Sequence, residues 1–140
     1  MISPVPLTKL FLTGIEVTVG FGNLISPSTK LPEQIYIPEG GKALILRKIS
    51  FHGFDPGDGA CQFRHKHLRI GFTVDAYFMN KGYEVERLVI ITKEEPLRYV
   101  LENLNDTSSI YFNITLQGIE ISESERLKIE EIVREMGGEV

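Results

Sequence analysis

The chain contains 140 residues, of which 42% are apolar and 24% are charged, and its formal net charge is −4. These values predict one soluble globular domain and exclude a disordered chain. The negative charge lies at the end, because residues 120–140 carry seven acids and three bases while residues 1–119 are neutral. A neutral body lacks the positive surface typical of nucleic-acid-binding proteins, so we do not expect a nucleic-acid partner.

The sequence shows no signal for export or membrane insertion. The first 14 residues contain two prolines and no basic region before an apolar stretch, so we expect no signal peptide. No apolar run approaches the roughly 18 residues that a membrane-spanning helix needs. The single cysteine, Cys61, cannot form an internal disulfide, and nothing indicates an oxidising compartment.

The first half of the chain shows the period-two alternation of β-strands. Apolar side chains alternate with polar or small ones in residues 15–21 and again in residues 33–37. Residues 42–52 predict a longer strand whose alternation shifts near Leu46 and Arg47, which we interpret as a β-bulge. Glycine, proline and aspartate in residues 53–59 then predict a loop.

The second half continues in the same way. Strands are predicted at residues 68–75, 85–92, 97–102 and 110–121, with residues 76–79 either extending the first of these or bending toward the next sheet. About eight strands result, and no helix-length segment separates them, which excludes parallel βαβ units. We predict an all-β, two-sheet antiparallel β-sandwich, jelly-roll-like rather than a closed barrel, because strand lengths are uneven and several connections are long.

The end of the chain has a different pattern. Ser122 followed by Glu125 forms a capping box, which predicts the start of a helix. Glycines at 137 and 138 predict its end, since glycine readily forms a left-handed cap. The sequence thus divides into a sandwich domain over 1–121 and an acidic amphipathic helix and tail over 122–140. The apolar stripe of this helix must cover either its own sandwich or another subunit, and comprises Ile129, Ile132, Val133 and Met136.

One histidine pattern resembles the opening of the cupin signature. Gly59 is followed after five residues by His65 and then His67, and two histidines at this spacing on a strand point to the same side. The cupin pattern then requires a glutamate a few residues further on, but the corresponding positions here are Gly71 and Phe72. His52 is the only other histidine of the chain. We therefore predict no metal site, and keep His52, His65 and His67 as candidate ligands of an alternative, cupin-like metal-binding protein.

No catalytic residue and no cofactor are predicted. Cys61 has no orienting partner placed by the sequence, and the G-x-S-x-G motif of serine hydrolases is absent. Five aromatic residues on several segments, Tyr77, Phe78, Tyr83, Tyr99 and Tyr111, suggest as another alternative a carbohydrate- or small-ligand-binding module. Partner contacts are predicted at the basic stretch and at the helix stripe, that is, at Arg64, Lys66, Arg69, Ile129, Ile132, Val133 and Met136.

Two segments carry a family resemblance. Residues 95–121 read EPLRYVLENLNDTSSIYFNITLQGIEI, and residues 37–50 read IPEGGKALILRKIS. Both are similar to strand pairs of single jelly-roll structural proteins of phages and other viruses. The resemblance implies a capsid, decoration or fibre-associated subunit. We expect a non-enzymatic structural protein that forms a homo-oligomer or joins other structural subunits, located in the virion if viral and in the cytoplasm otherwise.

Overall fold

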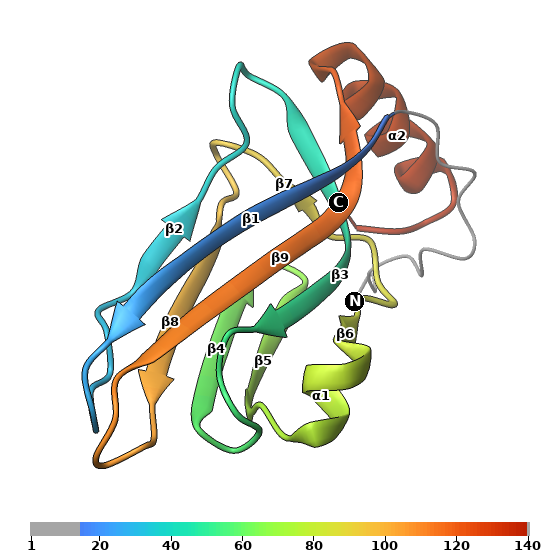
Figure 1. Cartoon of the computed structure of the whole chain (residues 1–140). Helices are drawn as coiled ribbons and strands as arrows, with labels where there is room; N and C mark the ends of the chain where they lie inside the picture. The colour runs from blue at the N-terminus through green and yellow to red at the C-terminus, as the bar shows by residue number, and fades with distance from the viewer. Residues whose placement is uncertain (1–14, 140) are drawn as a thin grey trace.

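A computed structural model describes residues 15–139, which fold into a β-sandwich of two antiparallel sheets (Figure 1). Sheet one has the strand order β1-β9-β3-β6, and β7 also pairs with β3, whereas sheet two has the order β2-β8-β4-β5. The strands of sheet one are β1 (Ile15–Ile25), β9 (Ile110–Ile121), β3 (Ala43–His52), β6 (Tyr83–Glu84) and β7 (Ile90–Ile91). Those of sheet two are β2 (Gln34–Tyr36), β8 (Leu97–Asn103), β4 (Gly59–His65) and β5 (Leu68–Thr73).

The strand pairs are nested along the chain. β1 pairs with β9, β2 with β8, β3 with β6 and β7, and β4 with β5. This is the connectivity of one long antiparallel hairpin rolled into two layers, which defines a jelly roll. The predicted fold class is therefore confirmed, including the helix at the end of the chain.

The main core lies between the two sheets. Each long strand turns alternate side chains inward, so that residues such as Phe63, Leu101 and Phe112 are almost completely buried. One buried polar side chain, Asn103, sits where β8 ends. Its amide nitrogen donates to the carbonyls of Ile25, Ser26 and Ser108 and so holds three loop carbonyls together.

The predicted bulge in β3 is confirmed. The register with β9 shifts between Leu46 and Lys48, so that one extra residue lies in β3 at this point. Gly118 on β9 is opposite Leu46, and a Cβ atom at Gly118 would lie only 2.3 Å from the carbonyl oxygen of Ile45. The close approach of the two strands at the bulge therefore requires glycine at this position.

The C-terminal helix α2 (Glu123–Glu135) covers the outer face of sheet one at one end of the sandwich (Figure 1). There Val133 is fully buried and Ile129 is half-buried against a second apolar cluster. The strand and loop residues of that cluster are Ala43, Ile45, Leu88, Ile90, Ile119 and Ile121. The helix thus packs on its own sandwich, while Ile132 and Met136 from the predicted stripe remain 48% and 47% exposed.

Both predicted ends of α2 are confirmed. The Ser122 hydroxyl accepts from the Glu125 backbone nitrogen, and the Glu125 carboxylate accepts from the Ser122 backbone nitrogen, which is a complete capping box. At the other end Gly137 has a φ of 77°. The Gly138 nitrogen donates to the Val133 carbonyl at 2.8 Å, which closes the last turn as a Schellman motif.

Three predicted segments differ from the structure. Residues 76–79 lie in a short helix, α1 (Ala76–Lys81), because Asp75 caps it by accepting from the Phe78 nitrogen. Only Ile90–Ile91 of the predicted strand 85–92 join a sheet; the other apolar residues there are buried without a strand ladder. Conversely, β4 at 59–65 was not predicted. Within residues 15–139 no helix has the length and apolar character needed to cross a membrane.

Candidate functional site

Three arginines lie side by side on the outer face of sheet two. Arg64 on β4 is the register partner of Arg98 on β8 and of Arg69 on β5. Neighbouring strands are about 4.8 Å apart, so the three Cα positions span about 10 Å across the sheet. We call this set, Arg98, Arg64 and Arg69, the arginine row. Like charges directly opposite each other on neighbouring strands destabilise a sheet, so the fold carries a cost here.

One acid partly offsets this charge. Glu33 accepts a hydrogen bond from Arg64 at 2.6 Å and lies 3.5 Å from the guanidinium of Arg98. Both arginine side chains remain about half exposed, at 53% and 45%. Arg69 makes no ion pair within residues 15–139. With Glu33 included, the row keeps a net charge of about +2 on this face of the sheet.

A shallow hollow of about 320 Å³ lies beside the arginine row. Gln62 lines it, and Gly71 adds no side chain that would fill it. A Cβ at Gly71 would stand 3.2 Å from the Gln62 side chain, so any larger residue would crowd this part of the hollow. The guanidinium groups of the arginine row and the amide of Gln62 thus line the same hollow.

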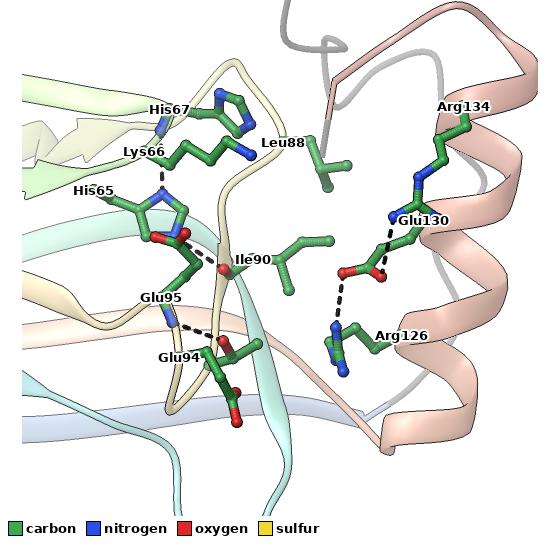
Figure 2. Close-up of a pocket in the computed structure, with 11 residues that line it drawn as sticks. His65, Lys66, His67, Leu88, Ile90, Glu94, Glu95, Arg126, Glu130 and Arg134 are labelled. Atoms are coloured by element: carbon green, nitrogen blue, oxygen red, sulfur yellow. Dashed lines mark hydrogen bonds and ion pairs between the residues drawn. The ribbon is translucent and has the colours of Figure 1, made fainter.

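A second concave site, the helix pocket, lies between the β4–β5 turn and α2 and has a volume of about 280 Å³. Figure 2 shows side chains of α2 pointing across it toward the turn, with Leu88 and Ile90 between them. On α2, Arg126 donates to Glu130 at 2.8 Å, and both side chains are mostly buried. The pocket residues are His65, Lys66, His67, Leu88, Ile90, Thr92, Glu94, Glu95, Arg126, Glu130 and Arg134.

His65 holds the turn that borders the helix pocket. Its Nδ1 accepts from the His67 backbone N–H at 3.2 Å, so its Nε2 carries the proton and donates to the Ile90 carbonyl at 2.9 Å (Figure 2). Burial lowers the pKa of His65, because the charged imidazolium would lose its hydration. His65 is therefore a neutral structural group. The Nε2 of His67 is buried without a hydrogen-bond partner among the described residues.

The three histidines do not come together. The ring centres of His65 and His67 are 6.4 Å apart, but His52 lies at the far end of β3 and hydrogen-bonds Thr115 on the outer face of sheet one. Seven residues of strand separate His52 from Ile45, whose register partner is Ile90, which corresponds to roughly 20 Å. Residues 15–139 contain no group of three His, Cys, Asp or Glu side chains placed to hold a metal.

The other candidate residues are also dispersed. Cys61 faces the core, and burial raises its pKa to about 12, which disfavours a nucleophilic thiolate. Tyr99 is buried, whereas the exposed Tyr77 and Tyr111 lie on different elements, α1 and β9. Phe78 packs against Phe72 at a ring distance of 4.2 Å. The aromatic residues thus do not form a continuous exposed platform for a sugar.

The predicted contact residues divide among three places. Arg64 and Arg69 belong to the arginine row, while Lys66 lies in the adjacent β4–β5 turn beside the helix pocket, 3.7 Å from Glu139 of its own chain. Val133 is covered by its own sandwich, so it stabilises this fold. The prediction missed Arg98 and Glu33. The outward position of Arg98 follows from the alternation of β8, but its pairing with Arg64 depends on sheet topology.

The outer edge of β1 is a further surface of interest. This strand has 11 residues and pairs with β9 on one side only within the described part of the chain. The other edge strands are shorter, with three residues in β2, six in β5 and two in β6. β1 contains no lysine, arginine or proline, which are the residues that usually protect an edge from pairing. Among residues 15–139 no other strand pairs with this edge, which leaves it open to another strand.

Comparison with protein-family models, with curated proteins and with solved structures finds no match to this chain.

Proposed function

We propose that this protein is a non-enzymatic structural subunit that self-associates, as a capsid or virion-associated jelly-roll protein of a virus or phage. The observation that carries the self-association is the long, unprotected edge of β1. The viral role is supported more indirectly, by the jelly-roll connectivity and by the resemblance of residues 37–50 and 95–121 to viral structural proteins.

Side-chain burial along β1 supports pairing at this edge. Val17, Val19 and Phe21 face the core but are only half-buried, whereas the inward residues Ile114 and Leu116 of the neighbouring β9 are 1% and 0% exposed. An additional strand beside β1 would cover the remaining apolar surface of these three residues. It would also satisfy the backbone groups that point away from β9.

A second copy of the same chain is a suitable partner. An antiparallel contact between two β1 strands about a two-fold axis at Gly20 would bring Gly20 opposite itself and Thr18 opposite Gly22. Such an isologous contact is the commonest form of homodimer interface. The outward side chains at these positions are small, and a Cβ at Gly20 would meet no atom within 4 Å. The pairing would join both copies of sheet one into one continuous sheet.

The test substitutes lysine at the centre of the proposed contact. In Gly20→Lys two ammonium groups would face each other about 5 Å apart, and their repulsion would amount to roughly 1–3 kcal/mol. We expect the dissociation constant to rise about 5- to 150-fold, measured by sedimentation equilibrium between micromolar and millimolar protein. Gly20 has room for a side chain, so we expect the variant to fold.

Gln117→Lys is the matched control. Gln117 is exposed on β9, beside Thr18 on the same sheet face but away from the edge. We expect this variant to associate like the wild type. A wild-type protein that remains monomeric at millimolar concentration contradicts the proposal. Equal weakening by both variants would show that the contact uses the sheet face and would refute edge pairing. Electron microscopy of concentrated wild-type protein then tests whether association leads to a closed or tubular particle.

A further inference from the structure

The arginine row carries an inference that goes beyond self-association, and it lies on sheet two, away from β1. From its geometry we infer that the row binds a small ligand with several oxyanion groups, of the polyphosphate class. Arg64 has an arginine as register partner on both sides, and this doubly unfavourable pairing is offset only by Glu33 among the described residues. Sites of this kind, where a local rule is broken without structural gain, are commonly functional.

Contacts within the chain hold the guanidinium groups of the row in place but leave most of their N–H donors unused. A guanidinium carries five N–H donors, and Arg64 uses one of them in its hydrogen bond to Glu33. Glu33 contacts both Arg64 and Arg98, so it restrains the two side chains next to each other. Their half-exposed guanidinium groups and that of Arg69 leave donors directed to solvent. Planar guanidinium donors match the oxygen pairs of phosphate groups in a bidentate geometry.

The charge and length of the site indicate the ligand class. A net charge of about +2 is complementary to a ligand with at least two negative charges rather than to a single carboxylate. The row spans about 10 Å, which favours several linked anionic groups over one isolated ion. The hollow of about 320 Å³ beside the row, lined by Gln62 and Gly71, offers space and an amide donor for further phosphate oxygens. Tripolyphosphate is the simplest probe with these properties.

The experiment measures binding of tripolyphosphate to the full chain by isothermal titration calorimetry at low ionic strength. We expect saturable binding with one site per chain, weakening as sodium chloride is added. Arg64→Ala and Arg69→Ala should each raise the dissociation constant at least tenfold. Arg47→Gln is the control, because it removes an exposed arginine from β3 in the opposite sheet, where Arg47 pairs with Glu16. We expect the control to bind like the wild type.

Thermal unfolding of the same variants provides an independent measurement. Removing Arg69 relieves its repulsion with Arg64, so the melting temperature of Arg69→Ala without ligand should not be reduced, although its binding is weakened. Three results would overturn the inference: no tripolyphosphate binding by the wild type at millimolar concentration, undiminished binding by the Arg64→Ala, Arg69→Ala double variant, or equal weakening by Arg47→Gln. Parallel titrations with a sulfated oligosaccharide and a single-stranded oligonucleotide test whether the row binds an anionic polymer instead. Binding of these polymers without binding of tripolyphosphate would also refute the inference of a small polyphosphate ligand.

Discussion

Truncation of Val133 to alanine tests whether α2 is an integral part of the sandwich. Val133 is fully buried in the cluster formed by α2 and the outer face of sheet one. The substitution removes two methyl groups, and the lost transfer free energy is about 0.8 kcal/mol for each. A residual cavity of about 40 Å³ adds roughly 1 kcal/mol. We therefore expect the free energy of unfolding to fall by about 2–3 kcal/mol, which for a domain of this size corresponds to a melting temperature lower by roughly 6–10 °C.

The assay is urea unfolding followed by circular dichroism, with Ile132→Ala as the matched control. Ile132 is the adjacent residue on the same helix and loses more atoms, but it is 48% exposed. We expect the control to lose less than about 1 kcal/mol, since little buried area disappears. An equal loss in both variants, or a loss below about 0.5 kcal/mol for Val133→Ala, would refute the packing of α2 on its own sandwich.

Three further predictions concern stability. Since the pKa of His65 is lowered in the folded protein, the unfolded state takes up more protons below about pH 6.5. The free energy of unfolding should therefore fall with decreasing pH, by at most about 1.4 kcal/mol per unit from this group. Urea unfolding at several pH values should show a shallower decrease in His65→Asn than in the wild type. Gly118→Ala should lose more than about 2 kcal/mol in the same assay because its Cβ would clash with backbone, whereas Gly20→Ala, with open space, should be neutral or stabilising. Asn103→Leu leaves three buried or half-buried carbonyls unpaired and should lower the melting temperature by an amount equivalent to about 3 kcal/mol or more; an unchanged value would contradict this role.

Where local pattern and final structure agree, one face of a strand is apolar and the other is polar. This holds for residues 15–21 and 110–116, whose alternation predicted β1 and most of β9. The capping box at Ser122 is similarly local, because all its hydrogen bonds lie within four residues. The bulge near Leu46 was interpretable because the pattern changes there, from the uniformly apolar residues 43–46 to the alternating residues that follow.

The missed elements depend on distant partners. β4 has the required alternation, but one of its inward positions is His65, a polar residue whose burial depends on the hydrogen bond that its Nε2–H donates to the Ile90 carbonyl. Residues 85–92 are apolar enough for a strand, yet only Ile90 and Ile91 form a ladder with β3, and Val85 and Val89 make single backbone hydrogen bonds to it.

The arginine row was only partly predictable for the same reason. Arg64 and Arg69 stood out in the sequence as a basic stretch. Arg98 and Glu33 joined them only through the pairing of β8 with β4 and the position of the chain before β2. The sandwich class thus follows from local periodicity, whereas the composition of the surface site follows from strand register, which the sequence pattern does not determine.

The first half of β3 has an unusual environment. Residues 43–46 pair with β9 on one side and partly with β7 on the other, the opposite sheet covers one of their faces, and α2 with the loop before β7 covers the other. Backbone amides enclosed in this way become accessible only when the whole domain opens. In deuterated buffer these protons should exchange last, so this segment forms the most persistent part of the fold and the natural reference for measuring its global opening.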